Sequence, residues 1–344
     1  MKRTWKILAG VSLPVVAWFA GTHWVWSQLL PEPLAPLTPA SGTTLSARSC
    51  QPCHSSIHEE WEASMMAKAM VDPIFVEDYE HQGRPFICLR CHAPLAEQQP
   101  ALAYGLLSVK PLIPLSVTND AFDAELQSEG VTCVVCHLEE GAMVGRLEDS
   151  HAPHPVRWGD PQASCARCHQ LEITPLSNLE RPLTDTVREW EKWKEETGRE
   201  DTCVDCHMPR VARVVGVGGP VRIGHEHSWH GAWDEDMLGD ALGIQAWRER
   251  GEVVVRLENL AGHHVPSGDP ARAVVVRAGD EEVVLARRVP LPRLIDLGDN
   301  TLRPGEVRFV RLPYANPVQV VFERLRFLDV EHNDPGVLLF EDFL

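Results

Sequence analysis

One pattern, C-x-x-C-H, occurs five times in this chain of 344 residues. The five copies use all ten cysteines, and a histidine directly follows each pair. Two thiols at this spacing can form thioether bonds to the vinyl groups of one porphyrin, and the adjacent imidazole then binds the iron as its proximal ligand. Zinc sites, redox-active dithiols and disulfide frameworks also contain cysteine pairs, but none of them requires the histidine. The sequence therefore predicts five covalently bound haem c groups.

The residues predicted to hold the haems divide into thiols and imidazoles, and we number the motifs 1 to 5 in chain order. The thioether-forming pairs are Cys50 and Cys53, Cys88 and Cys91, Cys133 and Cys136, Cys165 and Cys168, and Cys203 and Cys206. The proximal iron ligands are His54, His92, His137, His169 and His207.

The charge of the chain limits its partners. Asp and Glu number 49 against 32 Lys and Arg, which gives a formal net charge of −17. Such a chain cannot neutralise phosphates, so nucleic-acid binding is excluded. The negative field favours encounter with a basic redox partner or a cationic surface, or it serves only to keep the protein soluble. We expect other redox proteins, an unidentified donor and acceptor, as partners.

The N-terminal region predicts export. Residues 7–31 contain no charged side chain and follow Lys2, Arg3 and Lys6. The run is long enough to cross a bilayer, and the basic residues before it place the haem motifs on the outer side of the membrane. We expect residues 1–30 to be a membrane anchor or a signal peptide, and the lack of a clear cleavage site favours the anchor. The proline-rich residues 31–47 predict an extended linker to a periplasmic or other extracytoplasmic domain.

The remaining sequence divides near residue 250. Residues 48–249 carry all five motifs and predict a pentahaem domain of mainly α-helical and irregular structure. Later residues contain no cysteine, and short β-branched runs such as 273–277 and 318–322 alternate with Gly, Pro, Asp and Asn turns. Residues 250–344 therefore predict a small antiparallel, sandwich-like β-domain. The expected fold class is mainly α around five haems, with an N-terminal transmembrane or signal helix and this C-terminal β-domain.

The sixth, distal position of each iron needs a second ligand. Five of the 16 histidines are proximal, so eleven remain for at most five distal positions. Histidines that cluster near the motifs are the best candidates: His227 with its neighbours His225 and His230, one of His151 and His154, and one of His263 and His264. For the haem that is left, His58, His81 and Met66 compete.

Further patterns occur in a specific order. They are C-x-x-C-H-x6-W-x-x-S at 50–64, GVTCVVCH at 130–137, EW with CVDCHMP within 189–209, HSWHG at 227–231 and GHHVPSGDPAR at 262–272. From about residue 49 to 280 the chain resembles the multihaem cytochromes of the cytochrome c-554 type, whose haem packing is shared with hydroxylamine oxidoreductase and pentahaem nitrite reductase. The resemblance implies that His227 and His263 are distal ligands. Such proteins carry the pattern Ser-x-His, whose histidine is a haem ligand. This chain has Met66 in place of that histidine, so either Met66 is a thioether ligand or that haem has no sixth ligand.

Two main functions fit these features. The first is an electron carrier between membrane or periplasmic redox partners, in which a His/Met haem at Met66 would have a raised potential. The second is an oxidoreductase that binds a small nitrogen or oxygen species at a five-coordinate haem; a sensor or an assembly subunit is a third reading. We favour the carrier, with no catalytic residue assigned, because all five motifs end in histidine. Pentahaem nitrite reductases usually replace one proximal histidine with lysine.

Overall fold

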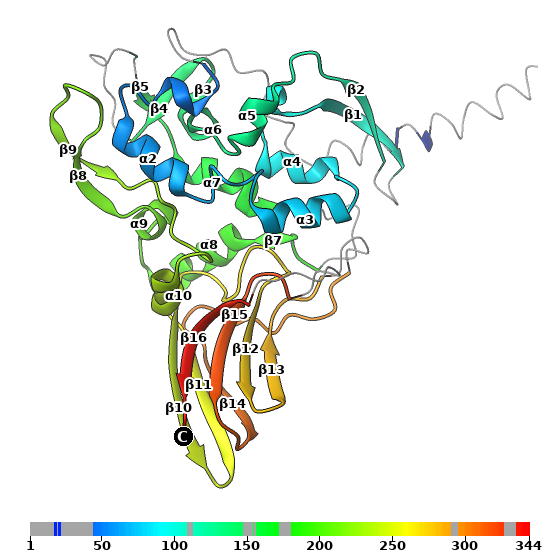
Figure 1. The fold of residues 1–344 in the computed structure, drawn as a ribbon, viewed down its shortest axis with the longest axis vertical. Helices are drawn as coiled ribbons and strands as arrows, with labels where there is room; N and C mark the ends of the chain where they lie inside the picture. The colour runs from blue at the N-terminus through cyan, green and yellow to red at the C-terminus, as the bar shows by residue number, and fades with distance from the viewer. Residues whose placement is uncertain are drawn as a thin grey trace, which may run out of the picture.

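The computed structural model describes residues 17–18, 20–21, 44–108, 113–146, 154, 156–171, 180–289, 295–326 and 335–344. Short helices and small sheets form one part of the molecule, and two larger sheets extend from it (Figure 1). Of the described residues, 29% are helical and 32% lie in strands. The expectation of a mainly α fold is therefore wrong.

The expected N-terminal helix lies almost entirely outside the described residues. Residues 17–18 and 20–21 are helical, and the rest of 1–43 is not described. Within the described ranges, no helix is both long enough and apolar enough to cross a bilayer. The candidate ligand His151 also lies outside those ranges.

Four of the five C-x-x-C-H motifs end a short helix, whose last residue is the motif histidine. These helices are α4 (Phe86–His92), α6 (Cys133–His137), α7 (Pro161–His169) and α9 (Cys203–His207). Motif 1 instead precedes α2 (Ser55–Ala63), and His54 is the N-cap residue of that helix. Helical residues three apart share a face, so the turn presents both thiols of a motif to the same side. The other helices are α3 (Pro73–His81), α5 (Ala124–Ser128), α8 (Thr186–Thr197) and α10 (Glu235–Ala241).

Small sheets connect the haem motifs and account for much of the error in the expected fold class. One sheet has the order β3 (Leu138–Glu139), β4 (Ala142–Gly145), β5 (Val156–Trp158). The others are two-stranded and pair β1 (Ala101–Ser108) with β2 (Ile113–Thr118), β6 (Gln170–Leu171) with β7 (Thr184–Asp185), and β8 (Arg210–Val214) with β9 (Val221–His225). Most of these strands have two to five residues. Such short segments carry too little hydrophobic periodicity to be recognised in the sequence.

The C-terminal strands form two antiparallel sheets around one core. The first sheet has the order β10 (Leu242–Glu249), β11 (Glu252–Asn259), β14 (Val307–Pro313); the second has the order β13 (Glu281–Leu285), β12 (Ala273–Ala278), β15 (Val318–Glu323), β16 (Val337–Asp342). Alternate side chains of both sheets, among them Val255, Val274 and Val320, are buried in the shared core. The first sheet begins at Leu242, before the domain boundary expected at residue 250. Arg250 and Gly251, both with positive φ, form the turn that connects β10 to β11.

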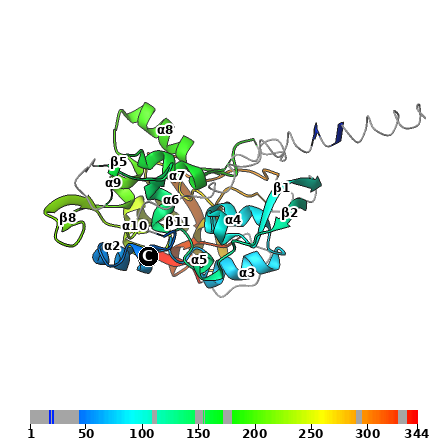
Figure 2. The same ribbon diagram turned by 90° about the horizontal axis from the view of Figure 1, so that it is seen from above.

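The loop between β11 and β12 returns from the sandwich to the haem motifs and packs against α8. The buried carboxylate of Glu189 in α8 accepts hydrogen bonds from the backbone N–H of His264 at 3.2 Å and from the Ser267 hydroxyl at 2.6 Å. Arg181 forms an ion pair with the same carboxylate at 2.7 Å. Helix α8 lies beside α7, which carries motif 4 (Figures 1 and 2). Glu189 therefore ties the loop that carries His263 to the haem part.

Replacing Glu189 with alanine should lower the free energy of unfolding by about 3 kcal/mol. The change leaves the Ser267 hydroxyl and one ion-pair contact of Arg181 without their acceptor, and buried hydrogen bonds to charged groups are worth about 1.5–3 kcal/mol each. Denaturant titration of the purified protein measures the effect. Glu191→Ala, at an exposed position of the same helix, should change it by less than about 0.5 kcal/mol. Equal losses in the two variants would contradict the role given to Glu189.

Candidate haem centre

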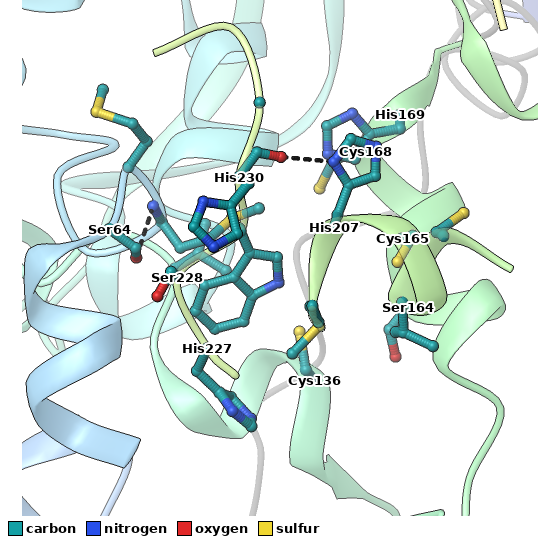
Figure 3. Close-up of a pocket in the computed structure, with 18 of the residues that line it drawn as sticks. Ser64, Cys136, Ser164, Cys165, Cys168, His169, His207, His227, Ser228 and His230 are labelled. Carbon is teal, nitrogen blue, oxygen red and sulfur yellow. Dashed lines mark hydrogen bonds between the residues drawn. The ribbon is translucent and has the colours of Figure 1, made fainter. Parts of the chain in front are cut away.

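A cavity of about 3100 Å³ lies among the motif helices. All ten cysteines and all five motif histidines line it. Part of its wall carries His169, His207 and His227 together with Cys165 and Cys168 (Figure 3). Sites for drug-sized molecules measure about 300–1,000 Å³. The cavity therefore suits several large prosthetic groups rather than one small ligand.

Cysteines of different motifs lie next to one another. Hydrogen bonds join Cys50 of motif 1 to Cys133 of motif 3, Cys91 of motif 2 to Cys168 of motif 4, and Cys165 of motif 4 to Cys203 of motif 5. In the described ranges, no group of three or more His, Cys, Asp or Glu is arranged around a bare metal ion. The thiols thus fit porphyrin attachment better than zinc binding.

Backbone carbonyls orient four of the five motif imidazoles. The Nδ1 atoms of His54, His92, His137 and His207 lie 2.6, 2.6, 2.9 and 2.5 Å from the carbonyl oxygens of Val215, Ala69, Val144 and His230, respectively. A carbonyl oxygen can only accept, so Nδ1 carries the proton. The lone pair of each ring then lies on Nε2, which is the arrangement that a histidine needs to bind a metal.

Three motif imidazoles face a second imidazole at a constant separation. The ring centroids of His54 and His154 are 6.1 Å apart, those of His137 and His227 are 6.1 Å apart, and those of His207 and His263 are 6.2 Å apart. Stacked rings in direct contact would be about 3.5–4.0 Å apart. An iron between two imidazoles lies about 2 Å from the nearest nitrogen of each ring. Adding the distance from that nitrogen to the ring centroid on each side gives about 6 Å between the two centroids. The spacing therefore matches one iron between two imidazoles.

Two of the facing histidines are held by backbone carbonyls in the same way as the motif histidines. The Nδ1 atom of His227 donates to the carbonyl of His225 at 2.9 Å, and that of His263 to the carbonyl of His264 at 2.8 Å. Burial lowers the pKa of both His169 and His227 to about 4. A neutral imidazole is the form that coordinates iron, because protonation removes the lone pair.

The candidate histidines differ in what their rings face. His154, His227 and His263 face motif imidazoles, whereas His225, His230 and His264 face none among the described residues. The Nδ1 atoms of His225 and His264 lie 2.7 and 2.9 Å from the Met208 carbonyl and the Thr301 hydroxyl, and His230 bonds to Asp234. His81 is exposed at the end of α3. The sequence had not indicated which motif each facing histidine serves, because the pairs join residues far apart in the chain.

Two motif histidines, His92 and His169, face no second imidazole in the part of the chain that the structure describes. His92 instead stacks on Phe75 with its ring centroid at 3.7 Å, a contact that the sequence had not predicted. Met66 packs beside Trp61 in a cluster that also includes Cys133 and Trp229, and it lines the cavity. Motifs 2 and 4 are therefore the positions at which the sixth iron ligand is not an evident histidine.

Comparison with known proteins supports the fold. No protein-family model and no curated protein matches the chain. Among solved structures, a penta-heme cytochrome c552 from Thermochromatium tepidum matches with a TM-score of 0.60 and 19% sequence identity, over 86% of this chain and 97% of that one. The chain thus shares the fold of a pentahaem c-type cytochrome across both the haem part and the sandwich.

The buried histidines should make stability depend on pH. Burial lowers the pKa of His169 and His227 from about 6.5 to about 4, and an iron bound to either ring would oppose protonation in the same direction. The unfolded state therefore binds more protons below pH 6.5, and the free energy of unfolding falls as the pH drops. Thermal midpoints measured from about pH 6.5 to 5, above the range where most carboxylates titrate, should decrease. A midpoint that is constant or rises on acidification would contradict this.

Proposed function

We propose that this chain is a multihaem electron-transfer protein that binds five haem c groups and works on the outer side of the cytoplasmic membrane, where such motifs receive haem. The observation that carries the proposal is the set of three facing imidazole pairs in one cavity that all ten cysteines line. An iron between two imidazoles has no free coordination position, so it can exchange electrons but cannot bind a substrate. The haem supplies a reversible one-electron change at iron, and the protein supplies ligands, spacing and burial.

The residues of this chain would divide the work as follows. The ten cysteines hold the porphyrins, and His54, His92, His137, His169 and His207 bind iron from the proximal side. His154, His227 and His263 take the distal positions at motifs 1, 3 and 5, which their facing rings support. Met66 is a proposed thioether ligand at motif 2 or 4, where it would raise the potential of that haem relative to the others.

Contacts between thiols suggest the order in which electrons pass. Motif 1 touches motif 3 through Cys50 and Cys133, and motif 4 touches motif 5 through Cys165 and Cys203. Cys136 of motif 3 lies close to Cys168 of motif 4, and Cys91 of motif 2 lies next to Cys168 as well. The motifs therefore form a chain 1–3–4–5, and motif 2 joins it at motif 4. Cys53 of motif 1 and Cys206 of motif 5 are exposed, so redox proteins would dock near these two ends.

An oxidoreductase is the second candidate function, and one observation favours it. His92 and His169 lack a facing imidazole among the described residues, so one of these irons could remain open to a small nitrogen or oxygen species. A redox titration separates the two functions. A carrier takes up and releases five electrons reversibly, and adding nitrite or hydroxylamine does not reoxidise it catalytically. Rapid turnover with either compound would favour the oxidoreductase function over the carrier function.

The intact mass of the mature protein should exceed that of its polypeptide by five haem units. Each motif contains a complete thiol pair and proximal histidine, so each should carry one porphyrin. Mass spectrometry under denaturing conditions measures only haems that are bound covalently. A stable product with four or fewer would contradict the proposed cofactor content.

Replacing His227 or His263 with alanine should convert one low-spin haem to the high-spin state. Each ring faces a motif imidazole at about the separation that one iron requires. Electron paramagnetic resonance of the ferric protein reports the change. His230→Ala and His264→Ala are matched controls, because these neighbouring rings bond to Asp234 and Thr301 instead. Unchanged spectra in both test variants would remove the two assignments.

A further inference from the structure

An arginine at the start of β12 opens into the haem cavity. Arg272 directly precedes this strand and lines the cavity. Its Nη1 atom donates to the carbonyl of Ser267 at 2.9 Å, and among the described residues the guanidinium has no further hydrogen bond and no ion pair. The nearby carboxylate of Asp269 instead accepts from the backbone N–H of Ala271. A guanidinium has five N–H donors, so most donors of Arg272 are unused.

The unused donors of Arg272 are accessible. No nitrogen of this side chain belongs to the buried polar atoms that lack a partner. Each unused nitrogen therefore has open space in front of it, and the side chain borders the cavity. A cation in such a partly buried place is stable only with a counter-ion or with several hydrogen-bond acceptors.

A second guanidinium lies beside the first. Ala273 of β12 pairs with Glu323 of β15, so Arg272 and Arg324, the next residues of the two segments, lie side by side at one end of the sheet. Both side chains line the cavity. Burial lowers the pKa of the Arg272 guanidinium, and the positive charge of Arg324 adds to that effect. Like charges side by side on neighbouring strands repel each other, and a bound anion would relieve the repulsion.

The loop that ends at Arg272 reaches motif 4. The hydroxyl of Ser267 bonds to Thr186 at 2.9 Å and to Glu189 at 2.6 Å, and both partners lie on α8, which contacts α7 and its motif 4. Burial lowers the pKa of the His169 imidazole to about 4, and among charged groups Arg272 adds most to this effect. Arg272 is therefore a close neighbour of the motif 4 histidine.

The haem itself can supply the missing anion. Its porphyrin carries propionate carboxylates, and a guanidinium can bind a carboxylate through two parallel hydrogen bonds. Resting on the haem binding proposed above, we infer that Arg272 and Arg324 form the propionate-binding site for the haem of motif 4. The β-domain then contributes compensating charge to the haem part in addition to the His263 imidazole.

Reduction potentials of the full haem-loaded protein test this inference. Arg272→Gln should lower the potential of one haem and leave the other four unchanged, because loss of a nearby positive charge favours ferric over ferrous iron. Redox titration followed by electron paramagnetic resonance resolves the individual haems. Arg272→Lys keeps the charge and should lower that potential less. Arg324→Gln should lower the potential of the same haem.

Arg277→Gln is the matched control. It removes the same charge from the same strand, but Arg277 pairs with Glu282 and Glu323 and does not line the cavity. All five potentials should stay as they are. Unchanged potentials in both Arg272→Gln and Arg324→Gln, or an equal decrease in Arg277→Gln, would overturn the inference.

The pH dependence separates propionate binding from a merely structural role. A carboxylate paired with guanidinium groups stays ionised well below its ordinary pKa, so in the unmodified protein that potential should be constant between about pH 6 and 8. In the double variant Arg272→Gln with Arg324→Gln, the propionate loses its partners in a partly buried site and its pKa rises. The potential should then fall as the pH rises, because ionisation adds negative charge near the iron.

A lowered potential that does not depend on pH in the double variant would contradict the propionate site. The proposed electron-transfer function would survive that result. Five covalent haems and reversible reduction by five electrons test that function separately.

Discussion

The haem part depends on hydrogen bonds from imidazole Nδ1 atoms to backbone carbonyls of other segments. Without such a bond, a ring can rotate and present either nitrogen to the cavity. The acceptors come from Ala69 after α2, Val144 in β4, Val215 after β8 and His230 before α10. None of these four residues lies in an α-helix. Much of the irregular structure between motifs therefore serves to bring a carbonyl behind a motif histidine.

This requirement helps to explain why the haem part contains small hairpins, although the sequence suggested mainly α-helical structure. The loop that joins β8 to β9 reaches motif 1 twice, since Val215 accepts from His54 and the N–H of Val217 donates to the carbonyl of Cys53 at 2.9 Å. Arg213 on β8 adds an ion pair to Glu60 on α2 at 2.7 Å. A helix satisfies its own carbonyls internally, whereas a turn leaves some free to accept from side chains. Turns and hairpins are thus the better elements behind a ligand.

The sequence predicted which residues gather around the cavity far better than it predicted the surrounding architecture. All ten thiols and five imidazoles of the motifs line one cavity, as the covalent pattern requires, because C-x-x-C-H constrains its own local geometry. Local clusters also pointed to the facing rings of His154, His227 and His263. The pairings themselves depend on contacts between distant segments, and strands as short as β3 or β6 leave no periodicity to detect. The sequence left His58 as one of several candidate ligands, because its burial and its lack of hydrogen-bond partners are visible only in three dimensions.

The sandwich places the His263 imidazole opposite motif 5 and also has a separate core. The side-chain amide of the buried residue Asn259, at the end of β11, donates to the carbonyls of His263 at 2.8 Å and Leu302 at 2.9 Å, and its oxygen accepts from the N–H of Ala261. Gly262 follows, where a side chain would lie only 3.1 Å from the Trp193 ring of α8. One end of the loop is thus fixed by the sheet and the other by Glu189. Because a metal ligand must be held closely in position to act on its metal, the β-domain acts as the scaffold that places His263 opposite His207.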